Sequence, residues 1–118
     1  MVHSHDWKVE RINHVLDLSN NGEYLDEETW DLEKVAVTTS EVVKKYGLAW
    51  DPEIIVPDDP KLLASLFQAG IELASRLGVY VRDTHRIIPY GADELWSGLK
   101  SMPTKLTMGV GADARNLF

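Results

Sequence analysis

The chain of 118 residues has room for one small domain and is too short for two ordinary ones. A hydrophobic fraction of 44% with 26% charged residues is typical of a folded globular protein and argues against a disordered chain. The net charge of -7 disfavours a nucleic-acid partner, and the absence of cysteine excludes disulfides, thiolate metal sites and a cysteine nucleophile.

The first residues and the longest apolar stretches of the sequence predict in which cellular compartment the protein lies. Residues 1–6 lack a basic region followed by an apolar run, and no window approaches the roughly 18 consecutive apolar residues of a membrane span. Export and membrane insertion are therefore not predicted. Together with the absence of cysteine, this favours a cytoplasmic protein without a membrane partner.

Two helices are predicted in the first forty residues. Asp6 is the expected cap of a helix over residues 7–18, where apolar side chains recur at helical spacing, and the Ser-Asn-Asn-Gly run at 19–22 stops it. A second helix is predicted to start at Asp26, because acidic residues stabilise the first turn of a helix. The β-branched run Val35–Thr39 is expected to break this second helix.

A helix is predicted to resume over residues 40–46 and to end at Gly47. Lysines in the last turn and a glycine after it are typical of a helix C-terminus. The following residues 50–58 contain Pro52 and Pro57, which leave no room for a helix. We interpret residues 50–58 as an extended connector within a single domain over residues 1–118.

The strongest pattern predicts a long helix from Pro60 to the residue before Gly78. Asp59 is the expected cap, and a proline at the first helical position is favourable there. We expect this helix to be the centre of the core, with Leu66 and Phe67 buried. Its apolar face comprises Leu62, Leu63, Leu66, Phe67, Ile71, Ala74 and Leu77.

Strand-favouring residues at 79–81 and 86–88 predict a short β-hairpin, and residues 91–102 predict another helix. The tail over residues 105–111 resembles a strand that leads into a glycine loop. The fold class is therefore mainly α with a short β-hairpin. Because no further element follows for this tail to pack against, we expect the chain to be part of a longer protein.

Metal binding is considered at the N-terminus, where a histidine in third place behind a free amino group binds copper or nickel. His3, His5 and Asp6 lie on a segment with nothing to fix their geometry, so no metal site is predicted. The acidic residues after Asp26 lack the alternating oxygen ligands and central glycine of a calcium loop.

The turn between the two hairpin strands concentrates polar chemistry. In one interpretation Asp83 orients His85 for proton transfer. Because sequence neighbours on a turn seldom converge on one point, we favour a structural or docking role for Asp83, His85 and Arg86, with Asp83 or Thr84 accepting a turn amide and Arg86 pairing with a carboxylate. No catalytic residue is predicted in this chain.

The glycine loop near the C-terminus is a second candidate. Gly109 and Gly111 resemble half of a dinucleotide fingerprint, but Ala114 occupies the position of the third glycine. The glycines allow a tight turn or the close approach of a backbone, with Asp113 and Arg115 at its mouth. We favour a structural loop.

Seven runs of residues, in this order, resemble the N-terminal region of the monomethylamine:corrinoid methyltransferases. The resemblance extends over roughly residues 24–116 and is most specific at Asp83–Ile87. The runs are Glu28–Leu32, Lys45–Leu48, Leu66–Gly70, Gly78–Tyr80, Asp83–Ile87, Asp93–Trp96 and Gly109–Ala114.

The resemblance implies a homo-oligomeric enzyme that moves the methyl group of methylamine to the cobalt of a corrinoid carried by a partner protein. It also implies a (β/α)₈ barrel, which needs about 200 residues or more and so lies outside this chain. This segment is then the helical part that precedes the barrel, it binds no cofactor itself, and its loop at Gly109, Gly111, Asp113 and Arg115 leads toward the barrel. The alternative is a stand-alone acidic helical module that acts only in protein interaction.

Overall fold

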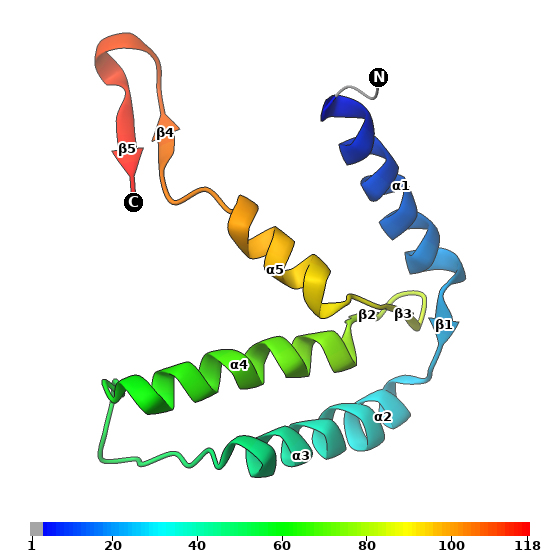
Figure 1. Cartoon of the computed structure of the whole chain (residues 1–118). Helices are drawn as coiled ribbons and strands as arrows, with labels where there is room; N and C mark the ends of the chain where they lie inside the picture. Colours follow the sequence, from blue (N-terminus) through cyan, green and yellow to red (C-terminus); the bar gives the residue numbers. More distant parts are fainter. Residues whose placement is uncertain (1–3) are drawn as a thin grey trace.

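The computed structural model describes the backbone of residues 4–118 and the side chains of residues 8–118. Helices and short strands alternate along it (Figure 1). The predicted helices and β-hairpin are present. In chain order the elements are α1 (Ser4–Asn21), β1 (Glu23–Tyr24), α2 (Glu27–Thr29), the π-helix η1 (Trp30–Val35), α3 (Ala36–Tyr46), α4 (Pro60–Leu77), β2 (Val79–Val81), β3 (Arg86–Ile88), α5 (Ala92–Ser101), β4 (Leu106–Met108), the 3₁₀ helix η2 (Gly111–Asp113) and β5 (Arg115–Leu117).

Helix α1 is longer than the predicted span of residues 7–18. It starts before Asp6, so the prediction that Asp6 caps it is wrong. At the other end, the side chains of Ser19 and Asn20 donate hydrogen bonds to the Leu16 carbonyl. These bonds to the preceding turn keep polar residues helical, and the helix therefore continues to the residue before the glycine.

The predicted helix start at Asp26 is confirmed, and Asp26 itself is the N-cap of α2. Its carboxylate accepts hydrogen bonds from the backbone N–H of Thr29 at 2.9 Å and from the Thr29 hydroxyl at 2.7 Å. The backbone hydrogen bond, followed by the hydroxyl bond, lowers the pKa of Asp26 below its ordinary value. The carboxylate therefore satisfies a helix-terminal amide that has no partner within the helix.

The prediction that Val35–Thr39 breaks the second helix is wrong. The chain stays helical from α2 through η1 to the end of α3, and the backbone N–H of Ala36 bonds to the carbonyl of Asp31 in a π turn. β-Branched residues cost only a few tenths of a kcal/mol each in a helix. Here Thr38 and Val42 are buried, and their packing outweighs that cost.

The end of α3 is confirmed at Gly47, which adopts the left-handed conformation with φ 59°. Residues 50–58 contain neither helix nor strand. Helix α4 then begins where the sequence predicts, because the Asp59 side chain accepts a hydrogen bond of 3.0 Å from the Lys61 amide and Pro60 occupies the first helical position.

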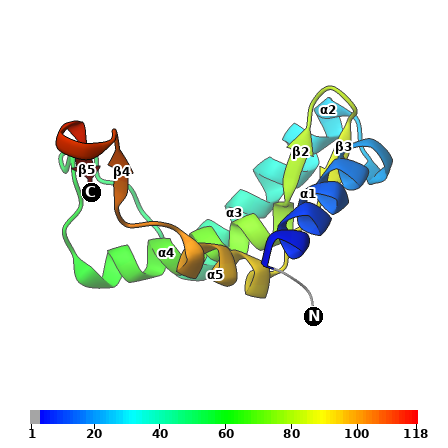
Figure 2. The same ribbon diagram turned by 90° about the horizontal axis from the view of Figure 1, so that it is seen from above.

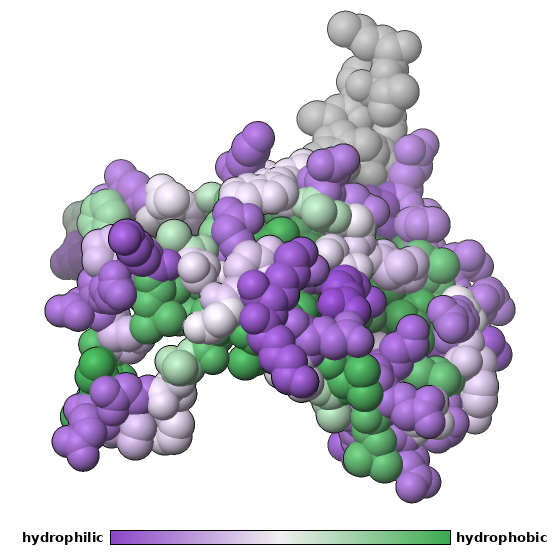
Figure 3. All heavy atoms as spheres, turned by 60° about the horizontal axis from the view of Figure 1, so that its bottom comes forward, coloured by the Kyte–Doolittle hydropathy of each residue, from purple (hydrophilic) through white to green (hydrophobic). Residues whose placement is uncertain are grey.

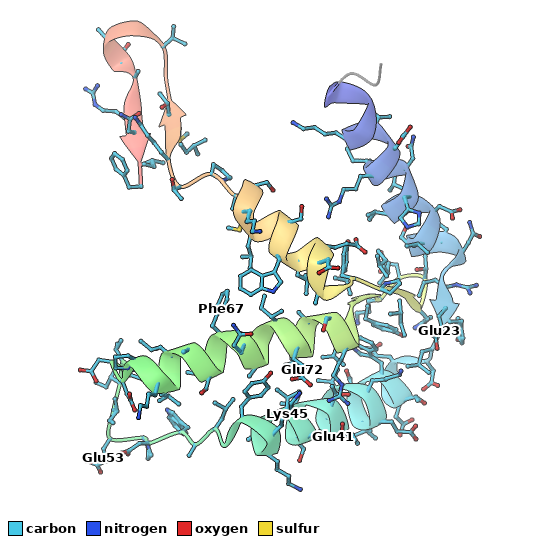
Figure 4. All side chains as sticks on the ribbon, in the orientation of Figure 1. Glu23, Glu41, Lys45, Glu53, Phe67 and Glu72 are labelled. Atoms are coloured by element: carbon cyan, nitrogen blue, oxygen red, sulfur yellow. The ribbon has the colours of Figure 1, made fainter. Side chains whose placement is uncertain are left out.

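Helices α3 and α4 lie side by side and antiparallel, forming a helical hairpin. Lys45 and Glu72 point toward one another across it, with 2.9 Å between the ammonium nitrogen and the carboxylate oxygen (Figure 4). Arg76 forms a second ion pair with Glu41. Both pairs are partly exposed, so they fix the register of the hairpin and add little stability.

A three-stranded antiparallel sheet joins this hairpin to α1. Its order is β1–β3–β2, with Tyr24 opposite Arg86 and Tyr80 opposite Ile87. The β2–β3 hairpin is confirmed, but β1 was not predicted because two residues give no periodic signal. The central strand β3 carries Ile87 and Ile88, both buried, and α1 packs on it.

The C-terminal region ends in a second hairpin. After α5, strand β4 and the glycine loop follow as predicted, but β5 then returns and pairs with β4 in antiparallel fashion. The expectation that no element follows for this strand to pack against is therefore wrong. Seen from above, the β4–β5 hairpin stands at one end of the molecule and the β2–β3 hairpin at the other (Figure 2).

The buried core is small and does not centre on the face of α4 that the sequence indicates. The side chains of Leu66 and Phe67 are 40% and 46% exposed, so their predicted burial is wrong for this chain. The Phe67 ring meets the Trp96 ring of α5 in an edge-to-face arrangement, with 5.4 Å between the ring centroids. Among residues 8–118, the buried hydrophobic side chains are Val42, Ala69, Ile87 and Ile88.

The molecule is open. Its Cα radius of gyration is 18.6 Å, against about 13.5 Å for a compact chain of this length. Its accessible surface is 9425 Å², against about 6,500 Å² for a compact protein of this mass. Patches of apolar residues accordingly lie open between hydrophilic ones (Figure 3). The chain leaves much apolar surface without a partner.

Candidate functional site

The turn between β2 and β3 holds the predicted group Asp83, His85 and Arg86. Tyr80, on β2, places its hydroxyl 2.7 Å from the carbonyl oxygen of Leu25 and 2.8 Å from Nδ1 of His85. His85 has a positive φ of 56°, and its own carbonyl accepts a hydrogen bond from the Leu25 amide. The turn is thus fastened to the segment between β1 and α2.

These distances assign the histidine tautomer. A carbonyl oxygen only accepts, so the single hydroxyl proton of Tyr80 is donated to Leu25. Partial burial raises the pKa of Tyr80, which keeps that proton in place at neutral pH. Nδ1 of His85 must therefore donate its own proton to the Tyr80 oxygen, and in the neutral form of the ring Nε2 is left as the acceptor.

Arg86 and Thr84 attach the same turn to the end of α1. The Arg86 guanidinium donates a 2.9 Å hydrogen bond to the Gly22 carbonyl and lies over the Tyr24 ring. The Thr84 hydroxyl donates to the Ser19 carbonyl. The prediction that Arg86 pairs with a carboxylate is wrong, because a backbone oxygen takes that place.

Asp83 does not orient His85. Its side chain is exposed, and it has no hydrogen bond or ion pair with any other side chain or backbone group that the structure describes. A nearby ion pair joins Arg82 to Glu27 instead, with 3.0 Å between Nε of the arginine and the carboxylate oxygen. Without a carboxylate on the imidazole, the turn lacks the acid–base pair that the proton-transfer interpretation requires.

An aromatic cluster around His85 was not predicted. Tyr80 stacks on Trp30 of η1 with ring centroids 4.9 Å apart, and Tyr24 meets the His85 ring edge-on at 5.8 Å. Tyr24 and Trp30 lie far in the sequence from Tyr80 and His85, so no local spacing could have joined these two pairs. The cluster makes the turn part of a packed junction.

The glycine loop lies elsewhere, at the tip of the β4–β5 hairpin (Figure 1). Gly109 has φ 91°, and a Cβ there would lie 2.6 Å from the Asp113 carbonyl oxygen, so only glycine fits. Gly111 has φ 62°, and the Arg115 guanidinium donates to the carbonyls of Ala112 and Ala114. The structure does not bring the two candidate groups together.

Two apolar pockets lie between helices. One of about 350 Å³ lies between the connector and the α3–α4 hairpin, and its lining includes Trp50, Ile54 and Leu66. The other, of about 480 Å³, lies among α1, α4 and α5 and includes Tyr90 and Leu99. Neither lining includes a histidine, and their chemistry suits packing against apolar groups.

The described part of the chain contains no group of three His, Asp or Glu side chains that could hold a metal ion. The side chains of His3 and His5 fall outside the described residues. Within the same part, no helix is both long enough and apolar enough to cross a bilayer.

Comparison with known proteins identifies the lineage. A family model described as monomethylamine methyltransferase MtmB matches residues 11–118. MtmB of Methanosarcina mazei is 39% identical over 101 residues, which are 86% of this chain and 22% of that protein. MtmB1 of Methanosarcina barkeri is 37% identical over the same shares.

Solved structures agree with the sequence match. The crystal structure of the Methanosarcina barkeri monomethylamine methyltransferase (MtmB) superposes with a TM-score of 0.78 and 34% identity, covering 88% of this chain and 22% of that chain. The crystal structure of the hydroxylamine MtmB complex gives the same values. The chain therefore spans about a fifth of the length of these relatives, and it belongs to the monomethylamine methyltransferase MtmB family.

Proposed function

We propose that this chain forms the N-terminal helical part of a monomethylamine methyltransferase that transfers the methyl group of monomethylamine to the cobalt of a corrinoid protein. In this proposal the catalytic (β/α)₈ barrel is supplied by further polypeptide, and the corrinoid belongs to the partner protein. The enzyme acts in the cytoplasm as a homo-oligomer. The observation that carries the proposal is the match of residues 11–118 to the MtmB family model.

The open shape supports a scaffolding role within such an enzyme. The chain exposes about 3,000 Å² more surface than a compact protein of its mass, and both pockets are lined mainly by apolar residues. Surfaces of this kind are expected to be covered by other parts of the enzyme. The turn between β2 and β3 then holds the helical part together through Thr84, His85 and Arg86, and it carries no chemistry.

A chimaeric enzyme tests this proposal. Residues 11–118 of this chain replace the matched segment of the Methanosarcina barkeri enzyme, and methyl transfer from monomethylamine to its corrinoid protein is measured. We expect turnover within about tenfold of the parent enzyme, because the segment shapes the scaffold and leaves the reacting groups unchanged. A chimaera that fails to fold, or that folds and loses turnover by about a thousandfold, would contradict the proposal.

The isolated chain provides the matching control. We expect it to show no methyl transfer under the same conditions, because in this proposal the reacting groups lie in the barrel. Turnover by the isolated chain would place the chemistry here and overturn this division of labour. The alternative of a free-standing interaction module predicts a chimaera that does not fold, together with an isolated chain that is a compact monomer or a defined dimer.

A further inference from the structure

The β4–β5 hairpin has one apolar and one polar face. Leu106 pairs with Leu117, Met108 pairs with Arg115, and directly paired residues share a face. The intervening pair, Thr107 and Asn116, points to the opposite face, where the Thr107 hydroxyl donates a 2.7 Å hydrogen bond to the Asn116 side chain. Two leucines and a methionine therefore lie together on one side.

Among the described residues, no other element packs on that apolar face. Leu106, Met108 and Leu117 are each more than half exposed. Neither strand makes more than marginal contact with any other element, and the hairpin stands apart from the helices in both ribbon views. Because an isolated two-stranded hairpin is only marginally stable in water, its apolar face needs a surface to pack against.

Contacts within its own loop fix the shape of the β4–β5 hairpin. Gly109 allows the chain to pass within contact distance of the Asp113 carbonyl. The Arg115 guanidinium is held by two loop carbonyls, at 3.2 Å and 2.9 Å. Arg115, the only charged residue on β4 and β5, thus points to the loop carbonyls. The apolar face therefore consists of the two leucines and the methionine.

We propose that this face closes the N-terminal end of the barrel in the intact enzyme, which rests on the function proposed above. The matched segment is the N-terminal part of relatives in which it makes up only 22% of the chain. The first strand of a parallel barrel starts at its N-terminal end, so a hairpin that precedes this strand lies at that end, opposite the active site.

The chemistry of that end fits the hairpin. The interior of an eight-stranded barrel is filled by layers of branched apolar side chains and is only wide enough for side chains. At the N-terminal end the last layer faces water unless something covers it. Leu106, Met108 and Leu117 would complete this layer, while Thr107 and Asn116 remain in water.

Hydrogen exchange in the chimaera tests the docking. We expect amides of residues 106–117 to exchange about a hundredfold more slowly in the chimaera than in the isolated chain, because docking adds the cost of opening the interface. Equal exchange in both would overturn the proposal. Protection that appears only in an oligomer, and is lost on dilution to monomers, would also overturn it and assign the face to a second copy.

Substitutions separate the two faces. Leu106→Asp should lower the thermal midpoint of the chimaera, whereas Thr107→Asp, on the polar face, should leave it unchanged. Met108→Ala should keep kcat/KM within about twofold, because the active site lies at the opposite end of the barrel. Equal effects at residues 106 and 107, or a large loss of kcat/KM without loss of stability, would contradict the proposal. An inactive parent chimaera would instead refute the proposed function.

Discussion

The His85 ring is held by a hydrogen bond to the Tyr80 hydroxyl, which is itself bonded to the distant Leu25 carbonyl. With the Tyr80 proton donated to Leu25, the imidazole must carry its proton on Nδ1. We expect ¹⁵N spectra of histidine-labelled protein to show a protonated Nδ1 and, in the neutral form of the ring, an unprotonated Nε2. A protonated Nε2 with a bare Nδ1 would contradict this assignment.

The Tyr80→Phe substitution tests the same contact energetically. It removes the hydroxyl that joins His85 to Leu25 but keeps the ring that stacks on Trp30. We expect a lower urea midpoint and loss of the tautomer preference. Tyr24→Phe is the matched control, because the structure shows no hydrogen bond to that hydroxyl, and its midpoint should match that of the original chain.

The lowered pKa of Asp26 predicts how the free energy of unfolding depends on pH. Its pKa is lowered in the folded chain, chiefly by the Thr29 amide, so it stabilises the fold above the pKa of the unfolded chain, about 3.9. That stabilisation is lost as the pH falls through the lower pKa that Asp26 has in the folded chain. Asp26→Asn keeps a cap and cannot titrate, so the stability difference between the two proteins should shrink below about pH 4. Parallel pH curves would contradict the assignment.

At the scale of elements, the centre of the core lies on strand β3 and on the contact between α3 and α4. Ile88 is 5% exposed, whereas Phe67 on α4 is about half exposed. Ile88→Ala should therefore cost about 2–5 kcal/mol in the free energy of unfolding, and Phe67→Ala should cost clearly less. Urea denaturation of both variants provides the comparison. A larger loss at Phe67 would restore α4 as the centre of the core.

At the scale of the whole molecule, the chain is an open scaffold. X-ray scattering of the monomer should give a radius of gyration near the 18.6 Å of the structure, and not the roughly 13.5 Å of a compact chain. The exposed apolar surface should also bind a hydrophobic dye. Light scattering on the same sample establishes that the protein is a monomer. A monomer with a radius of gyration near the compact value would contradict the open structure.

Local chemistry explains which features the sequence by itself determined. The helix start at Asp26, the cap at Asp59 and the left-handed Gly47 depend on groups within a few residues of one another, so the pattern alone locates these helix ends. The β2–β3 hairpin and the position of the turn at residues 83–86 follow from equally short-range preferences. Short runs of residues likewise indicated the family.

Tertiary structure alone decided the features that depend on distant partners. Packing of Thr38 and Val42 keeps a helix intact through a β-branched run, and pairing with β3 turns two residues into strand β1. The Tyr80 hydroxyl reaches a carbonyl 55 residues away, which no spacing rule could reveal. Burial is a property of what packs against a side chain, so the amphipathic pattern of α4 correctly marked an apolar face but could not show that this chain leaves that face half open.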